Sequence, residues 1–393
     1  MDFRDSPEEA VFRADLRAWL AVNLPADWSD RQPNVGRYDV AFAREWTATL
    51  HAGGWTGLSW PVKYGGRGLP LTYQGIYLEE CARADAPDHI GPIGLAMAGP
   101  TILTVGTPAQ KQRHLPKILT GEEIFCQGFS EPESGSDLAS LRTRAERDGE
   151  DFVVNGQKIW SSYAEIADWC ILLTRSEPTS SRHSGLTYLL LDMTSPGVEV
   201  RPLRQMTGDP EFNEIFFTDV RVPAANVLGA AGGGWQVAMT TLLHERGTLG
   251  FALTVILEKL LNRLIATART VQLDGRCPAA DPLMRDRIAG LWIDLQGLRY
   301  TNYRALSALL RTGVPGPEGS AAKLHWSEAN QRLTSLAIEM MGAGGLLDGT
   351  DAWWGGFWSY AQLRSRGNTI EAGTSEILRT IIAERVLDLP RSR

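Results

Sequence analysis

A short segment rich in hydroxyl groups is the densest set of potentially reactive side chains in the sequence. The segment Phe129-Ser-Glu-Pro-Glu-Ser-Gly-Ser-Asp137 follows an apolar run and brings Ser130, Ser134 and Ser136 close together. Hydroxyls and free backbone N–H groups in a loop suit an anionic or polar cofactor, although a plain turn of Ser, Gly and Pro has the same composition. The segment has neither Gly-x-Gly-x-x-Gly nor Walker spacing, so a standard dinucleotide-binding or ATP-binding fold is not supported.

Trp160 is a second candidate because it lies beside the hydroxyls of Ser161 and Ser162. A Trp next to a hydroxyl can stack on a planar ring while the hydroxyl donates a hydrogen bond to that ring, but a Trp at a strand end is more often part of the core. The chain has 13 Trp against 11 Phe and 9 Tyr, whereas Trp is normally the rarest aromatic residue. The excess suggests that some Trp rings do more than pack.

Glu245 is a carboxylate among apolar residues of a predicted helix and is one candidate for a general base. Together with Ala238, Leu242 and Leu249 it follows helical spacing, which places it on an otherwise apolar stripe. A carboxylate on a buried stripe has a raised pKa unless it is paired, and this suits proton abstraction. The alternative is a Glu paired with Arg246 or His244 on a helix surface.

Composition and terminal sequence exclude several other classes of protein. The four cysteines are scattered without a Cys-x-x-Cys pair or a Cys/His cluster, so we expect no metal site, no disulfide scaffold and a cytoplasmic location. The net charge is 39 − 46 = −7 without a Lys/Arg block, which gives no reason to expect a nucleic-acid partner. The N-terminal segment Met1–Glu9 is charged and not a secretory signal. The uncharged stretch 90–110 has too many Gly and Pro residues for a membrane span.

The elements that would position these residues follow a helical, β, helical order. Apolar residues at helical spacing predict helices over 8–20, 42–50 and 76–84 and again over 235–269, 282–310, 321–341 and 374–387. Strand-like runs between these blocks cover 124–129, 152–154, 171–174, 186–192, 198–202 and 215–217.

The pair Asn155-Gly156, between Val154 and Lys158, predicts a two-residue β-hairpin. We therefore expect an α+β multidomain protein with an N-terminal helical domain (1–121), a central antiparallel β-domain (122–230) and a C-terminal helical bundle (231–393).

Four segments, in this order, resemble those of the flavin-dependent acyl-CoA dehydrogenases. They are Gly128-Phe-Ser-Glu-Pro-Glu-Ser-Gly-Ser-Asp137, Val154-Asn-Gly-Gln-Lys-Ile-Trp160, Asn213-Glu-Ile-Phe-Phe-Thr-Asp-Val-Arg-Val-Pro223 and Thr369-Ile-Glu-Ala-Gly-Thr-Ser-Glu-Ile377. The resemblance covers nearly the whole chain, and four ordered motifs are far more specific than one. It implies two helical domains around a β-domain, bound FAD, a homotetramer or a mixed tetramer, and electron transfer to an electron-transferring flavoprotein.

The resemblance also implies which residues contact FAD. At the flavin ring and pyrophosphate it places Phe129, Ser130, Ser136, Trp160 and Ser162. Near the adenosine, and at the FAD of a neighbouring subunit, it places Thr374, Glu376, Arg269, Gly342, Gly344 and Gly345. The sequence departs from the family after Arg269, where a Phe-Gly pair and a later Gln are missing, and at Glu339, where Gln is common. Contacts that bridge subunits are therefore expected to be altered.

The resemblance assigns the catalytic base by its position. Many members place a Glu directly before Gly-Thr-Ser, but here that position is Ala372, which cannot take a proton, and Glu371 lies one residue earlier. A second base position in the family, on the helix after the β-domain, matches Glu245. Arg246 and Ser136 match positions near the substrate.

The resemblance implies removal of two hydrogens from the α,β bond of an acyl-CoA or an acyl-carrier thioester. The sequence looks most like bacterial members with the alternative base, several of which act on bulky acyl groups that include steroid side chains. Trp353-Trp-Gly-Gly-Phe-Trp358 could line an acyl pocket or an interface, or pack helices. Two other functions stay open: oxidation of a non-thioester substrate, and a non-catalytic subunit of a mixed tetramer.

Overall fold

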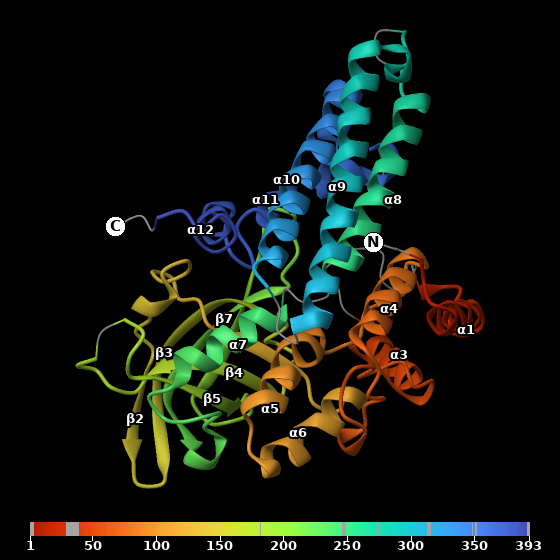
Figure 1. Ribbon diagram of the computed structural model, residues 1–393. Helices are drawn as coiled ribbons and strands as arrows, with labels where there is room; N and C mark the ends of the chain where they lie inside the picture. The colour runs from red at the N-terminus through yellow and green to blue at the C-terminus, as the bar shows by residue number, and fades with distance from the viewer. Residues whose placement is uncertain are drawn as a thin grey trace. The chain divides into compact units, whose positions relative to one another are not determined.

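The computed structural model describes residues 4–28, 39–180, 182–245, 249–272, 275–312, 316–347, 349 and 352–390. The chain forms two compact units (Figure 1). The helical unit comprises Met1–Leu20, Leu71–Ala86 and Arg246–Arg393, and the sheet unit comprises Ala21–Pro70 and Pro87–Glu245. The division of the sequence at residues 121 and 230 follows chain order and stays a prediction.

The helical unit consists of amphipathic helices whose apolar faces share one core. Figure 1 shows the long helices α8, α9 and α10 side by side. Along α9, Leu291, Leu295 and Leu298 are buried at helical spacing and pack with Leu333 and Trp358. The helices are α1 (Pro7–Asn23), α4 (Leu71–Arg83), α8 (Leu249–Thr270), α9 (Pro282–Thr312), α10 (Glu318–Met341), α11 (Phe357–Asn368) and α12 (Ser375–Arg385).

An ion-pair cluster joins α1 to α4 within the helical unit. Arg13 Nη1 lies 2.7 Å from Glu80 Oε1, and Arg17 Nε lies 2.5 Å from Glu80 Oε2. Burial raises the pKa of Glu80, but the hydrogen bonds from the two arginines outweigh burial, so the pKa lies below its usual value. Glu80 is therefore ionised at neutral pH.

The sheet unit packs helices against a seven-stranded sheet with strand order β1-β4-β2-β3-β7-β6, and β5 joins β4. The sheet is antiparallel except that β4 runs parallel to β1 and, at one bridge, to β2. The helix α7 packs on β5 (Figure 1), and β4 and β5 are buried along most of their length. The helices are α3 (Val40–Ala52), α5 (Gly99–Val105), α6 (Pro108–Thr120) and α7 (Gly234–Glu245). The strands are β1 (Phe125–Gly128), β2 (Arg144–Asp148), β3 (Asp151–Ser162), β4 (Trp169–Arg175), β5 (Leu186–Asp192), β6 (Val198–Leu203) and β7 (Phe212–Pro223).

The predicted hairpin at Asn155-Gly156 is wrong. Both residues lie inside β3, at a bulge where the register against β7 shifts. The Asn155 amide donates to Asp219 Oδ1 at 3.0 Å, and its oxygen accepts from the Asp219 N–H at 3.0 Å. A Cβ at Gly156 would lie 2.7 Å from Thr143 Cα, so close strand packing explains this glycine. The turn that joins β2 to β3 instead contains Gly149, with φ 62°.

The fold class predicted from the sequence is confirmed: helices come first, a mostly antiparallel sheet follows, and helices return. Strand β2 was not predicted because Ala145 is its one buried residue, which leaves no apolar alternation. The predicted helix over 235–269 falls on α7 and α8, and residues 246–248 lie outside the described residues. The stretch 90–110 forms the π-helix η2 (Gly94–Ala98), α5 and the start of α6.

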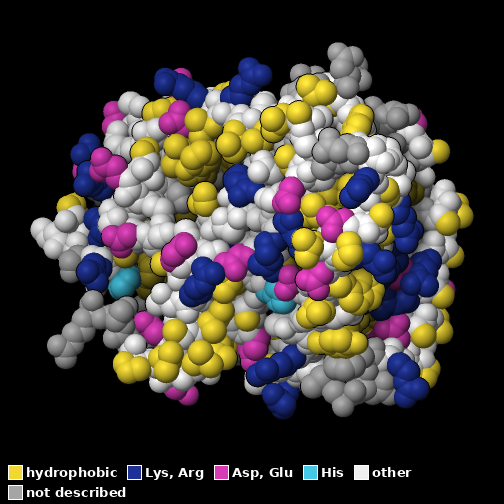
Figure 2. All heavy atoms as spheres, turned by 90° about the horizontal axis from the view of Figure 1, so that it is seen from above, with side chains coloured by type: hydrophobic (Ala, Val, Ile, Leu, Met, Phe, Trp, Pro, Cys, Tyr) yellow, Lys and Arg dark blue, Asp and Glu magenta, His cyan; other side chains and the backbone are white. Residues whose placement is uncertain are grey.

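The surface carries both charge signs and several exposed apolar side chains. On the face in Figure 2, Lys and Arg side chains stand among Asp and Glu side chains. Trp160, Trp292, Trp353 and Trp354 are each more than two-fifths exposed. Among the described residues, no helix is long and apolar enough to cross a membrane, and no group of His, Cys, Asp and Glu side chains could hold a metal ion.

Candidate functional site

The predicted FAD residues divide between the two units. Those assigned to the flavin ring lie in the sheet unit, after β1 and at the end of β3. Those assigned to the adenosine end lie in the helical unit, on or next to α8, α10 and α12.

The loop after β1 is fixed by backbone hydrogen bonds. The Ile159 N–H on β3 donates to the Ser130 carbonyl at 2.9 Å, and the backbones of Glu131 and Ser134 exchange bonds of 2.9 and 3.0 Å. The Ser134 hydroxyl donates to the Asp137 carbonyl at 2.8 Å and does not face outward. Ser136 is exposed at the tip. Of the three serines, Ser134 therefore has a structural role, while Ser136 is available to a ligand.

Trp160 points out of the sheet unit and not into its core. Its φ is 61°, an uncommon value for a bulky residue, and it lies within the register shift against β7 between Lys158 and Ser161. The indole is 57% exposed and meets Phe212 edge-on at 5.9 Å. The core alternative for Trp160 is therefore wrong. Ser162 is half-buried two residues later, and the hydroxyl of the buried Ser161 has no partner within the described part of the chain.

A buried ion pair lies underneath the same segment, and the sequence did not predict it. Lys158 is fully buried, and its Nζ donates to Glu131 Oε1 at 2.8 Å and to the Phe129 carbonyl at 2.9 Å. Burial raises the pKa of Glu131, but the charge of Lys158 and the hydrogen bonds to the carboxylate outweigh it and lower that pKa. Burial lowers the pKa of Lys158, and the nearby Glu131 opposes this shift.

The Phe129 side chain belongs to the core, so it reaches a ligand only through its backbone. It packs edge-on against Tyr188 at 5.8 Å. The Tyr188 hydroxyl lies 3.0 Å from that of Thr241 on α7, and the Thr101 hydroxyl on α5 donates to Thr241 at 2.9 Å. Burial raises the pKa of Tyr188 well above its usual value, so its proton stays in this chain of hydroxyls. The chain connects the cofactor loop to the helix that ends at Glu245.

Glu245, the predicted base, is the last residue of α7, one turn after Thr241. Its side chain and the whole of Arg246 lie outside the described residues. The preceding residue, His244, has Nε2 3.4 Å from the Thr104 hydroxyl. Burial lowers the pKa of His244, which favours the neutral imidazole at pH 7.

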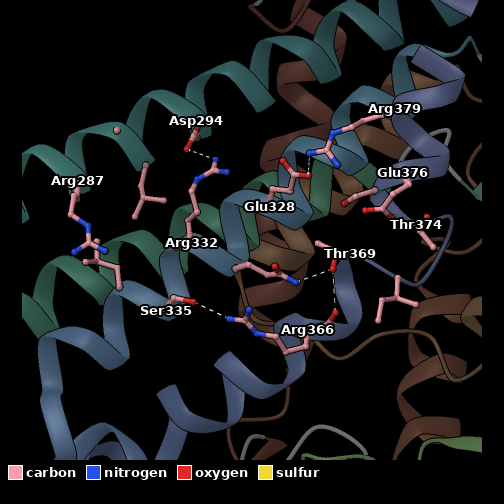
Figure 3. A pocket seen from close by; sticks show the side chains of 16 residues that line it. Arg287, Asp294, Glu328, Arg332, Ser335, Arg366, Thr369, Thr374, Glu376 and Arg379 are labelled. Atoms are coloured by element: carbon pink, nitrogen blue, oxygen red, sulfur yellow. Dashed lines mark hydrogen bonds and ion pairs between the residues drawn. The ribbon is translucent and has the colours of Figure 1, made fainter. Parts of the chain in front are cut away.

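In the helical unit, a pocket of about 1000 Å³ opens between α9, α10, α11 and α12 (Figure 3). Figure 3 shows Arg332 directed at Asp294, Arg379 at Glu328 and Arg366 at Ser335. These contacts measure 2.7, 2.5 and 2.9 Å. Paired arginines and carboxylates therefore line much of the pocket.

Two polar atoms in this pocket are buried and have no partner among the described residues. They are Arg366 Nε and Ser375 Oγ. Arg366 is also the pocket arginine for which the described residues provide no carboxylate, whereas Arg287 is held by Glu339 at 2.5 and 2.8 Å. A buried donor without an acceptor costs free energy. The pocket therefore suits a ligand with polar acceptors near Arg366 and Ser375.

Thr374 and Glu376 lie at the start of α12 and line this pocket. Thr374 is the N-cap of the helix, and its hydroxyl accepts from the Ile377 N–H at 3.3 Å. Lys323 on α10 donates to the carbonyls of Asn368 and Gly373 at 2.7 and 2.9 Å and so fixes the segment before the cap. Sequence reasoning missed Lys323, since a lysine is nearly always assumed to be exposed.

The first base position is closed to proton abstraction. Ala372 has φ 52° and carries no acid group. The Glu371 carboxylate accepts from Arg364 at 3.0 Å and from the Asn368 amide at 2.6 Å. Glu371 is therefore engaged in holding its own loop.

The Gly-rich segment 342–345 and Arg269 are the residues assigned to the FAD of a neighbouring subunit. Gly342 has φ 55°, and a Cβ at Gly345 would lie 3.0 Å from the Ile338 carbonyl, so local structure alone explains both glycines. Gly344 faces open space. Arg269 is exposed in the last turn of α8. Their contacts with FAD stay predictions.

The Trp cluster divides between packing and surface. Trp358 is fully buried, and its Nε1 donates to the Thr267 hydroxyl at 3.0 Å, which makes it a core residue. Trp353 and Trp354 are each 44% exposed and meet edge-on at 6.1 Å. Neither residue lines the pocket.

Comparison with known proteins identifies the chain. Models of the acyl-CoA dehydrogenase N-terminal, middle and C-terminal domains match residues 6–122, 126–220 and 232–387. The chain belongs to the acyl-CoA dehydrogenase family. It is 43% identical to acyl-CoA dehydrogenase IpdE1 of Mycobacterium tuberculosis over 388 residues, which cover 97% of both chains. Members of this family bind FAD and are oxidoreductases that act on CH–CH bonds. Both properties therefore apply to this protein.

Two solved structures resemble the chain over its whole length. The "Tcur3481-Tcur3483 steroid ACAD" and the ChsE4-ChsE5 complex from Mycobacterium tuberculosis each superpose with a TM-score of 0.86 at 31% identity, and all of both chains is covered. The present acyl-CoA dehydrogenase has features that fit FAD. Trp160 offers an exposed indole close to Ser162, and the pocket at α12 holds two polar atoms for which the described residues provide no partner.

Proposed function

We propose that Glu245 is the base of this acyl-CoA dehydrogenase and that its substrate carries a bulky, ring-containing acyl group. The base assignment depends on one observation above all. The other base position of the family is Ala372, and the neighbouring Glu371 is bound to Arg364 and Asn368. Glu245, at the end of α7, is then the acid that matches a family base position.

In the proposed reaction, a carboxylate oxygen of Glu245 takes the α-proton of the thioester. When bound, FAD supplies the acceptor for the hydride that leaves Cβ, so that a carbon–carbon double bond forms. Trp160 and Ser162 would hold the flavin ring, because the indole is exposed and the hydroxyl follows it on the same strand. The hydroxyl chain Tyr188–Thr241–Thr101 would fix α7 and so the position of Glu245.

The adenosine end of FAD would occupy the pocket beside α12. Thr374, Glu376 and Arg366 line it, and two of its polar atoms lack partners within the part of the chain that the structure describes. Most of its arginines are neutralised by carboxylates. A nucleoside therefore fits this pocket better than a diphosphate does.

The substrate proposal is supported by the solved relatives. One of the two structures above is described as a steroid acyl-CoA dehydrogenase, and its resemblance extends over the whole chain. A carrier-bound thioester is the second candidate, since the prolyl acyl carrier protein oxidase AnaB superposes with a TM-score of 0.81 at 25% identity. CoA remains favoured because the relative at 43% identity is an acyl-CoA dehydrogenase.

The quaternary structure and redox partner also belong to the proposal. The ChsE4-ChsE5 structure is a complex of two proteins. In this chain, Arg287 donates two hydrogen bonds to the carboxylate of Glu339, a position where the family commonly has Gln. We therefore place the chain in a mixed tetramer ahead of a homotetramer, with an electron-transferring flavoprotein as electron acceptor and the cytoplasm as location.

A panel of thioesters tests this function. The purified, FAD-containing protein is mixed anaerobically with straight-chain, branched and steroid-derived acyl-CoA and with an acyl-carrier thioester, and flavin absorbance is followed. We expect bleaching with the ring-containing acyl-CoA. Failure of every thioester to bleach the flavin, alone or with a partner subunit added, would contradict the proposal.

A further inference from the structure

We propose that the buried Lys158–Glu131 pair is the positioning device on which FAD affinity of the sheet unit depends. It joins the loop after β1 to the part of β3 that carries Trp160. The inference rests on the proposed FAD assignment of these two segments and adds a residue pair that does not itself need to touch the cofactor. Three observations within the sheet unit carry it.

The first observation is where Lys158 sits. It lies on β3 two residues before Trp160 and is fully buried. Its ammonium group donates to the Phe129 carbonyl at 2.9 Å, at the exact start of the Phe129–Asp137 loop, and to Glu131 Oε1 at 2.8 Å. One side chain thus connects two segments that lie about thirty residues apart along the chain.

The second observation is that the Glu131 carboxylate accepts three hydrogen bonds. Besides Lys158, its Oε1 accepts from the Thr143 N–H at 2.8 Å, and its Oε2 accepts from the Arg142 N–H at 2.7 Å. The carboxylate therefore closes the far end of the same loop onto the start of β2. The loop is held at Phe129, at Glu131 and at residues 142–143, while Ser136 stays exposed between these points.

The third observation is the contrast with another ion pair on the same strand. Arg221 pairs with Asp151 at 3.2 Å at the opposite end of β3, and the two side chains are 59% and 34% exposed, whereas Lys158 is fully buried. Exposed pairs contribute little and fix little. A buried pair loses much solvation, so its presence is better explained by the conformation that it fixes than by stability. Here the fixed conformation is that of the cofactor loop relative to Trp160.

The test compares FAD affinity with stability in three variants of the full-length holoprotein. Lys158→Met removes both bonds of the ammonium group, and Glu131→Gln keeps the shape of the side chain but removes its charge. Val154→Ala is the matched control, because Val154 is a fully buried residue of β3 whose side chain belongs to the hydrophobic core of the sheet unit. FAD release on dilution is measured by flavin fluorescence, and the unfolding temperature is measured in parallel.

We expect Lys158→Met to raise the FAD dissociation constant about tenfold, because the loop is no longer held in its binding conformation. Glu131→Gln should raise it less, in the same direction. Val154→Ala should lower the unfolding temperature and leave the dissociation constant within twofold of wild type.

Two results would overturn the inference. One is a Lys158→Met protein that holds FAD as tightly as wild type, or, if that variant does not fold, a Glu131→Gln protein that does so. The other is a Val154→Ala protein that releases FAD as readily as Lys158→Met. Failure of the proposed function is a separate result, since every thioester would then leave the wild-type flavin unbleached, whatever the FAD affinity of the variants.

Discussion

The ring end and the adenosine end of the predicted FAD site are both held by a buried lysine, but in different ways. In the sheet unit, Lys158 has a carboxylate partner, Glu131, and one carbonyl. In the helical unit, Lys323 donates to two carbonyls, those of Asn368 at the end of α11 and Gly373 just before α12. Carbonyls at a helix C-terminus carry partial negative charge and can hold a cation.

The two ends also differ in what they offer to a ligand. The ring end presents an exposed indole on a rigid strand, whereas the adenosine end is a pocket between helices. A flat ring suits stacking, and a pocket with unpartnered donors suits a polar group. One cofactor would therefore be bound by stacking at one end and by hydrogen bonds at the other.

Replacing the buried lysine of the helical unit, Lys323, should reduce stability more than any other change considered. Lys323→Met leaves the carbonyls of Asn368 and Gly373 without this donor, and unsatisfied buried groups cost about 1–3 kcal/mol each. We expect the free energy of unfolding to fall by about 4 kcal/mol in urea titrations. Lys259→Met, which loses a partly exposed pair with Asp85, should cost less than about 1 kcal/mol. Equal losses in the two variants would show that Lys323 is not a special anchor.

The two units should lose stability over different ranges of acidic pH. Burial lowers the pKa of His89 in the sheet unit to about 4, against about 6.5 in an unfolded chain. The unfolded state then binds more protons, so stability is complete above pH 6.5 and is lost as the pH falls toward 4. Glu80 in the helical unit, with a lowered pKa, loses its contribution only below its usual value of 4.5.

For His89 we expect a loss of about 2 kcal/mol in the free energy of unfolding between pH 7.5 and 5. His89→Gln should remove most of this dependence in urea titrations at the two pH values. His183→Gln, at an exposed histidine of the same unit, should retain it. A wild-type protein whose stability is the same at both pH values would contradict the assignment of a neutral, buried His89.

Trp160→Ala should separate binding from stability at the ring end. The indole is 57% exposed, so the free energy of unfolding should change by less than about 0.5 kcal/mol. FAD should bind about tenfold more weakly, since stacking on the indole is lost. Trp292→Ala removes a similarly exposed ring of the helical unit that does not line the pocket, and its FAD affinity should match wild type. Unchanged FAD affinity in Trp160→Ala would contradict the assignment of Trp160 to the flavin ring.

The smallest effect is expected in the pocket. Arg366→Gln should weaken the binding of AMP, measured by calorimetry, by about threefold, because Arg366 Nε has no partner there among the residues that the structure describes. Arg379→Gln should change AMP affinity less, because Arg379 is already bound to Glu328. A larger effect of Arg379→Gln would contradict the assignment, because Arg379 and not Arg366 would then bind the nucleotide.

Much of the fold could be predicted from the sequence because apolar periodicity follows burial directly. Helix α9 buries Leu291, Leu295 and Leu298 as its spacing requires, and β4 and β5 are continuous apolar runs. The hairpin failed because Asn-Gly favours a turn only when the chain has no better partner, and here Asp219 binds Asn155. Strand β2 had almost no apolar residues to reveal it.

The site could be predicted only in part, since side-chain surroundings depend on distant segments. The motifs indicated Trp160 and Thr374, but the burial of Lys158 and Lys323 depends on Glu131 and on the end of α11. The pocket is lined from four helices, so no local pattern could reveal it. The positions that the motifs indicated remain predictions until binding is measured.

The base assignment is tested most directly by anaerobic mixing of FAD-containing Glu245→Gln protein with a thioester that bleaches the wild-type flavin. The variant should keep its FAD and show no bleaching, because the amide cannot take the α-proton. Glu371→Gln, whose side chain holds Arg364 and Asn368, is the matched control and should bleach. Bleaching of Glu245→Gln at the wild-type rate would contradict the account.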